Sequence, residues 1–203
     1  GSAAVFVGLA ATVIFAVNLL GSLSGPAGKG STALRFVKLG VVSFFVTSLL
    51  NFLLALRGFA VTAQFTLLPE LRDWLVLYAV FSTSVFGAAY FFLPRLSGKV
   101  FRSTALVGAH YYATVVGILA IAVALGWGGW QQGHLLNDAN VPFADVTKAL
   151  TPWLTLRSIG LMFLTVGHAA FLINFVWQVC PINSRTTPAA SFANPPALEA
   201  QKA

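Results

Sequence analysis

Acidic side chains are scarce in this sequence. Only 5 of its 203 residues are Asp or Glu, and none of them lies inside a long apolar stretch. Proton and cation pumps usually carry titratable carboxylates within their membrane spans, so this absence argues against such a pump acting alone. All charged residues together make up 8% of the chain, against roughly 25% in soluble proteins. The composition therefore excludes an ordinary soluble domain.

Cysteine is nearly absent as well. The single thiol, Cys180, cannot form an internal disulfide, and no neighbouring residue completes a metal site. We interpret it as a small apolar residue at a helix end, with a reactive or lipidated thiol as the alternative. The sequence also lacks a Gly-rich phosphate loop, an HExxH motif and a nucleophile triad. Residue chemistry alone thus predicts no catalytic residue and no metal ligand.

Five long apolar stretches dominate what is present. Each has about 18 to 24 residues, which at ~1.5 Å per residue matches a hydrocarbon core of ~30 Å. A helix satisfies its own backbone hydrogen bonds, which lipid cannot do. We therefore predict an all-α membrane domain at residues 1–180 followed by a disordered cytoplasmic tail at 181–203, with transmembrane helices at about 3–20, 36–56, 74–93, 104–125 and 156–179.

Basic residues are divided unequally between the two sides of such a bundle. Four lie on the side of the second and fourth loops, and eight on the other side: Lys29, Arg35, Lys38, Arg95, Lys99, Arg102, Arg185 and Lys202. The positive-inside rule then predicts an outer N-terminus and a cytoplasmic C-terminus. The net charge of +7 is thereby explained by topology, and we expect no nucleic-acid partner.

The two outer loops carry local signals. Pro69 favours a short helical turn just before the third span. Residues 142–150 favour a short helix lying along the outer surface, and the tryptophans of this loop fit an interfacial aromatic belt.

Three histidines are candidates for chemistry. His168 lies near the middle of the fifth predicted span, His110 nearer the cytoplasmic end of the fourth, and His134 in an outer loop. A haem b clamped between two helices needs two imidazoles at similar depth. Counted from the cytoplasmic ends, the first two histidines differ in depth by roughly 8 Å, which predicts a poor clamp. For His168 we favour a hydrogen bond to a neighbouring helix over a haem or proton-relay role, and for His110 interfacial hydrogen bonding over ligation.

Other polar residues in the spans have simpler interpretations. Asn18, Asn51 and Asn174 are expected to join helices through their amides. Lys38 is expected to snorkel to the cytoplasmic interface.

An ordered set of motifs extends the argument. Residues 86–101, FGAAYFFLPRLSGKVF, resemble a span end in subunit I of the cbb-type haem–copper cytochrome c oxidases, where G-x-x-Y-x-x-x-P-R/K precedes a Gly or basic turn. Similar elements occur in family order at 17–25, 34–58, 109–117, 128–133 and 149–160. This resemblance implies the C-terminal half of that subunit, the last five of its twelve helices, in the inner membrane of a bacterium.

One departure from the family pattern concerns its cofactors. The family's H-x-H pair, which ligates the high-spin and low-spin haems, aligns without gaps with Arg72 and Trp74. A guanidinium and an indole cannot ligate iron. The family's copper ligands and its other low-spin haem ligand belong to helices that would precede Gly1. The resemblance therefore implies that this chain binds neither haem nor copper in the family manner.

Two functions remain open at this point. The first is a structural, haem-free subunit of a respiratory or electron-transfer complex, with other membrane subunits and cytochrome c-type subunits as partners. The second is one fragment of an active oxidase or nitric-oxide-reductase-like enzyme whose ligands lie on other chains; the chain would then be oxidoreductase-like only within that complex. A haem b of the wider complex could contact His168, or pair its propionates with Arg72 and Arg157, for which solvated loop charges are the alternative. A transporter finds little support, because no broken-helix pattern appears.

Overall fold

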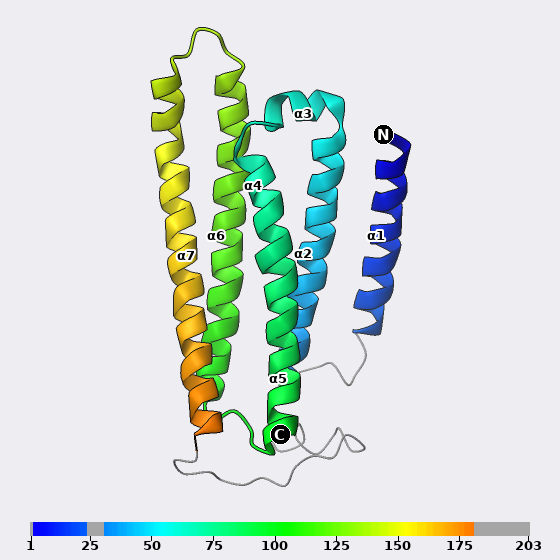
Figure 1. The fold of residues 1–203 in the computed structure, drawn as a ribbon, viewed down its shortest axis with the longest axis vertical. Helices are drawn as coiled ribbons and strands as arrows, with labels where there is room; N and C mark the ends of the chain where they lie inside the picture. The colour runs from blue at the N-terminus through cyan, green and yellow to red at the C-terminus, as the bar shows by residue number, and fades with distance from the viewer. Residues whose placement is uncertain (1, 24–30, 181–203) are drawn as a thin grey trace.

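The protein is a bundle of long, nearly parallel helices (Figure 1). This computed structural model describes residues 2–23 and 31–180, and in these ranges it contains helices and no strand. The elements are α1 (Ser2–Ser22), α2 (Thr32–Ala55), α3 (Arg57–Ala63), α4 (Leu67–Trp74), η2 (Leu75–Ser82), α5 (Thr83–Ser97), α6 (Thr104–Leu136) and α7 (Phe143–Val179). Five helices are long and apolar enough to cross a membrane, which confirms the predicted fold class. The tail predicted at 181–203 lies outside the described residues.

The third span is longer than predicted. Elements α4, η2 and α5 follow one another without a break and form one helix over Leu67–Ser97. Its start is capped by Thr66, whose hydroxyl accepts a hydrogen bond from the Leu68 amide at 3.2 Å. The short helix expected at Pro69 is therefore the first turn of the span. Its middle, η2, is a π-helix, a wider turn that is frequent at functional sites.

The last two helices also exceed their predicted lengths. Helix α6 has 33 residues and α7 has 37, more than the ~20 needed to span a bilayer, and their upper ends project beyond the other helices (Figure 1). The surface helix predicted at 142–150 is wrong, because these residues form the first turns of α7. Val146 and Leu150 are buried there, and α7 packs on α6. His134, predicted in a loop, lies in the last turn of α6.

Small residues let α6 and α7 approach closely. A Cβ built on Gly117 would lie 2.9 Å from the Gly160 carbonyl oxygen, and one on Gly160 would lie 3.0 Å from the Gly117 carbonyl oxygen. The two backbones are therefore in contact at this crossing. Such small-residue contacts are how membrane helices gain packing energy without a hydrophobic driving force.

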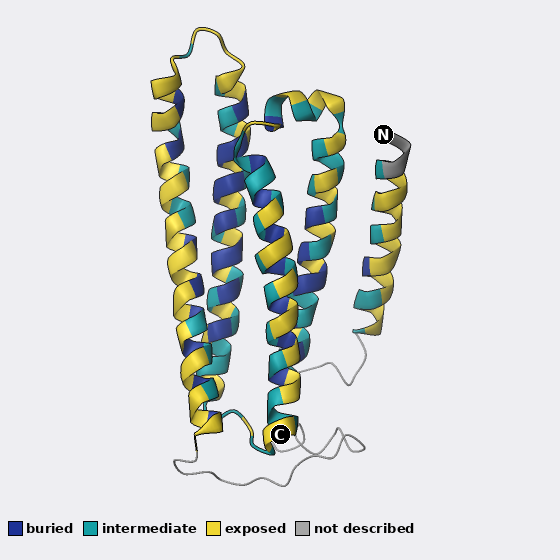
Figure 2. Ribbon diagram, in the orientation of Figure 1, coloured by how far each residue is buried: buried dark blue, intermediate teal, exposed yellow. Residues whose placement is uncertain are grey.

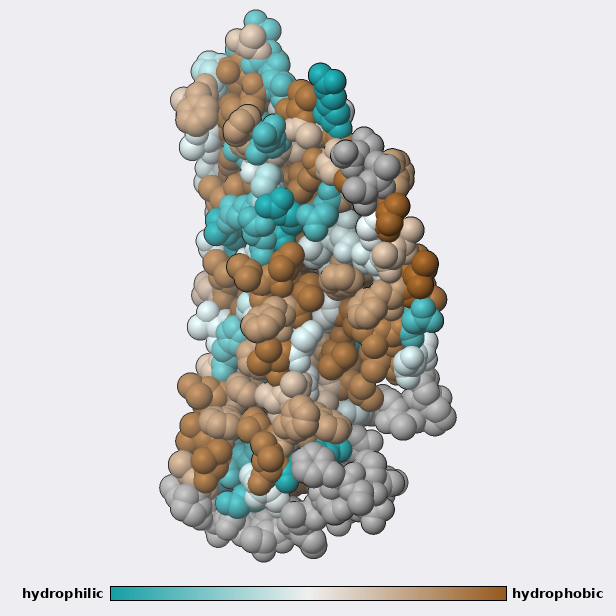
Figure 3. Space-filling view, turned by 45° about the vertical axis from the view of Figure 1, so that its right-hand side comes forward, coloured by the Kyte–Doolittle hydropathy of each residue, from teal (hydrophilic) through white to brown (hydrophobic). Residues whose placement is uncertain are grey.

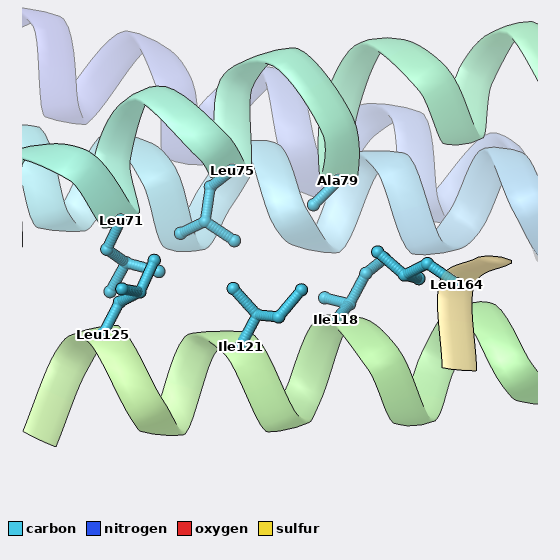
Figure 4. Packing of buried hydrophobic residues seen from close by; sticks show 7 residues of the cluster. All are labelled: Leu71, Leu75, Ala79, Ile118, Ile121, Leu125 and Leu164. Carbon is cyan, nitrogen blue, oxygen red and sulfur yellow. The ribbon is translucent and has the colours of Figure 1, made fainter. Parts of the chain in front are cut away.

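The core lies between α6 and the long third helix. Figure 4 shows its main cluster, in which side chains of α4, η2, α6 and α7 meet: Leu71, Leu75, Ala79, Ile118, Ile121, Leu125 and Leu164. Buried residues face this centre, whereas α1 is mostly exposed (Figure 2). Helix α1 packs on α2 through the ring pairs Phe6–Phe52 and Phe15–Phe44. The face drawn in Figure 3 is largely apolar below a hydrophilic patch in its upper half, as expected of a surface in contact with lipid.

We predict that Gly160→Ala destabilises the bundle by about 1–3 kcal/mol, since the added methyl overpacks the α6–α7 contact. The matched control is Gly108→Ala on α6, where a Cβ meets nothing within 4 Å. It should be neutral or stabilising by up to ~1 kcal/mol through helix propensity. Unfolding in mixed dodecylmaltoside–SDS micelles, followed by circular dichroism, measures both. Equal losses in the two variants would contradict the close crossing.

Candidate functional site

Two histidines and two tyrosines form hydrogen-bonded pairs inside the bundle. The Tyr78 hydroxyl lies 2.8 Å from His168 Nε2, and the Tyr90 hydroxyl lies 2.9 Å from His110 Nδ1. The ring of Phe86 contacts both imidazoles, with centroid distances of 4.5 Å to His110 and 5.4 Å to His168. We call these five residues the imidazole cluster. Each pair joins the long third helix to a different helix, α7 for Tyr78 and α6 for Tyr90.

The two histidines lie at similar depth, contrary to prediction, and a Cβ built on Gly167 would lie 3.4 Å from the His110 carbonyl oxygen. Their ring centroids are 6.0 Å apart, so the expected mismatch of roughly 8 Å is wrong. The reason is the start of α6: the Asn174 side chain accepts from the Ser103 amide at 3.1 Å and donates to the Ser103 carbonyl at 2.8 Å. Ser103 is therefore level with Asn174 and not with the end of α7. His110 follows Ser103 by seven residues and His168 precedes Asn174 by six, which makes them neighbours.

His110 is the more enclosed of the two. Its side chain is fully buried and is surrounded by aromatic rings, including Phe36 at 4.9 Å and Phe171 at 5.3 Å between centroids. Within the described ranges its Nε2 has no hydrogen-bond partner. His110 therefore lies in the packed interior of the bundle, whereas the sequence predicted that it lies at the membrane interface.

His168 instead lines an open groove between the third helix and α7. The groove has a volume of about 640 Å³ and is lined mostly by apolar and aromatic side chains. Its lining residues are Tyr78, Ser82, Phe86, Thr165, His168, Ala169, Phe171 and Leu172. Because Thr165 and Ala169 belong to the exposed face of α7, the groove opens sideways, towards lipid in a membrane. The predicted hydrogen bond of His168 to a neighbouring helix is present.

The cluster does not fit a haem clamped by both histidines. A porphyrin would have to lie between the two imidazoles, where Phe86 contacts both rings. His168 Nε2 is already hydrogen-bonded to Tyr78. Across the described residues, no three His, Cys, Asp or Glu side chains lie close enough together to hold a metal ion.

Arg72 and Trp74, which the sequence comparison predicts to replace the family's axial histidines, have partners of their own. The Arg72 guanidinium lies 2.7 Å from the Asp73 carboxylate, and the Trp74 ring stacks on Tyr78 with a centroid distance of 5.2 Å. Arg157 of α7 forms a 2.8 Å ion pair with Glu70 of α4. Both arginines remain about one-third exposed, so they are accessible cations at one end of the bundle. The structure does not bring them into contact with His168.

Sequence reasoning missed Tyr78, Tyr90 and Phe86 as members of the site. Tyr90 and Phe86 lie in the run 86–101 that carries the family motif, so that motif could have indicated them. Tyr78 gave no signal, because only the packing of the third helix beside α7 brings it to His168.

Comparison with known proteins identifies the family to which this chain belongs. No curated protein matches the chain. The model of the family described as Cytochrome C and Quinol oxidase polypeptide I matches residues 1–182, which includes all the described helices. The chain therefore belongs to that family, the subunit I family of the haem–copper oxidases.

Proposed function

We propose that this chain is a structural, haem-free subunit derived from subunit I of a cbb-type oxidase, and that it serves within a respiratory or electron-transfer complex. The observation that carries this proposal is the use of both imidazoles as hydrogen-bond partners of tyrosines, at 2.8 and 2.9 Å. Arg72 and Trp74 at the predicted axial-ligand positions support it, because neither side chain can ligate iron. On this proposal the chain is not catalytic by itself.

The packing suggests how such a subunit would act. The imidazole cluster and the α6–α7 crossing join three helices, the long third helix, α6 and α7, into one scaffold. Most of α1 stays exposed on the rim of the bundle. An exposed apolar helix can pack against other membrane subunits or a cytochrome c-type subunit, as well as lipid. The basic excess at the end where α5 connects to α6 supports an orientation with the N-terminus outside and the C-terminus in the cytoplasm. We place the chain in the inner membrane of a bacterium.

The alternative is one fragment of an active haem–copper oxidase or nitric-oxide-reductase-like enzyme, with haem and copper ligands on other chains. The exposure of Arg72 and Arg157 favours this alternative, because these guanidiniums could exchange their carboxylate partners for the propionates of a haem b held by a partner chain. The groove beside His168 would then face the same partner.

The first prediction from this proposal concerns haem content. Purified from a haem-replete membrane, the chain should contain far less than one haem per polypeptide in a pyridine haemochrome assay. A stoichiometric haem b would refute the structural role. Loss of that haem in His168→Ala, but not in His134→Ala, would then identify the ligand.

The second prediction concerns the Tyr78–His168 hydrogen bond. Tyr78→Phe and His168→Phe should each lower the free energy of unfolding by about 0.5–1.7 kcal/mol, the range of side-chain hydrogen bonds between membrane helices. The double variant should lose less than the sum, because both changes remove the same bond.

The control for this cycle is Tyr112→Phe, which removes the hydroxyl of an exposed tyrosine on α6. It should change the free energy by less than ~0.5 kcal/mol. Detergent unfolding followed by circular dichroism measures the wild type and all four variants. If the losses of unfolding free energy in Tyr78→Phe and His168→Phe simply add in the double variant, the two side chains do not stabilise the bundle through a bond to each other.

A further inference from the structure

Charge is separated along the bundle axis. All four acids in the described ranges lie at the end that carries α3 and the α6–α7 turn: Glu70, Asp73, Asp138 and Asp145. The opposite end carries five described cations: Arg35, Lys38, Arg95, Lys99 and Arg102. Three of these five lie in the last turn of α5 and in the connection from α5 to α6, a segment that we call the basic turn (residues 95–102). Within the described part of the chain, none of the three forms an ion pair.

The basic turn is held in place by α7. Gly98 adopts a left-handed conformation with φ of 65°, which reverses the chain after α5. Gln178, only 3% exposed, donates from Nε2 to the Ser97 hydroxyl at 3.0 Å and to the Lys99 carbonyl at 2.8 Å. The Asn174–Ser103 contact fixes the other side of the turn. The cations therefore project from a backbone anchored at both ends.

Apolar side chains surround these cations. The Arg95 guanidinium lies 3.6 Å from the Phe91 ring centroid, and that of Arg102 lies 5.5 Å from the Trp177 ring. Leu96 and Val100 are exposed by 73% and 48%. A soluble anion would gain nothing from such exposed apolar groups, whereas a lipid has acyl chains to cover them. These cations have no acidic partners and lie beside exposed apolar side chains. Such a surface is complementary to a molecule with an anionic headgroup and a hydrocarbon tail.

We propose that the basic turn binds an anionic glycerophospholipid. Its phosphodiester accepts hydrogen bonds from Lys99 and Arg102, and its acyl chains lie against Trp177 and Val100. Guanidinium and ammonium groups both recognise phosphate, the former in a fork geometry. This site goes beyond the proposed function and does not depend on whether any haem is retained. It also differs from the general basic excess of the sequence, because the rigid turn places specific cations beside specific apolar groups.

The test uses the full chain, delipidated in detergent and titrated with palmitoyl-oleoyl-phosphatidylglycerol or the zwitterionic phosphatidylcholine of the same acyl chains. Native mass spectrometry counts the lipids that remain bound. We expect the anionic lipid to bind at least tenfold more tightly. Lys99→Gln combined with Arg102→Gln should remove that preference.

The matched control is Arg57→Gln, which removes one exposed cation at the opposite end, with Lys148→Gln added to equal the charge change. This control should alter the affinity by less than twofold. Circular dichroism checks that every variant is folded. A further arm adds inorganic phosphate, which should not displace the lipid at equal concentration.

Three outcomes would overturn the site. Equal retention of the two lipids would show that the headgroup charge is not recognised. An equal loss of affinity in the control variant would mean that the attraction is diffuse and comes from net charge. Displacement of the lipid by inorganic phosphate would identify a free-anion site that does not use the acyl chains.

Discussion

The contact between Asn174 and the backbone of Ser103 sets the geometry on which the rest of the structure depends. The buried amide of Asn174 bonds both the N–H and the C=O of Ser103. Helices α6 and α7 therefore cannot slide along each other without leaving polar groups unpaired in an apolar interior, which is costly. This contact fixes the register of α6 against α7. That register places Gly117 against Gly160, brings His110 within 6.0 Å of His168, and anchors the turn that follows α5.

The imidazole cluster uses side chains that could ligate a metal as hydrogen-bond partners between helices. Each imidazole shares a hydrogen bond with a tyrosine of the long third helix, and Phe86 contacts both rings. The π-helical segment η2 contains Tyr78 and follows α4, whose last turn contains Arg72 and Trp74. In lipid, a polar side chain that loses its partner has no water to replace it. The cluster therefore stabilises the bundle by the same bonds that occupy the histidines, which is why we favour a scaffold over a redox centre.

Much of the fold was predictable from the sequence, whereas much of the site was not. The long apolar runs predicted five membrane helices, and all five are present. Helix ends were predicted less well, because Gln131 and Trp153 look like loop residues in sequence but bond to each other across the α6–α7 hairpin at 2.7 Å. The depth of the histidines was wrong for a related reason: counting from helix ends assumes that those ends are level, and Asn174 makes them unequal.

The sequence by itself determined that the chain lies in a membrane, because uncharged runs of this length have no other stable environment. It also determined that iron has no ligand at positions 72 and 74, since that follows from side-chain chemistry alone. Only the tertiary structure decided which polar groups meet. The pairing of Tyr78 with His168, the burial of His110 and the anchoring of the basic turn all depend on the register and rotation of neighbouring helices. Those are set by contacts between residues 20 to 90 positions apart, which no local pattern encodes.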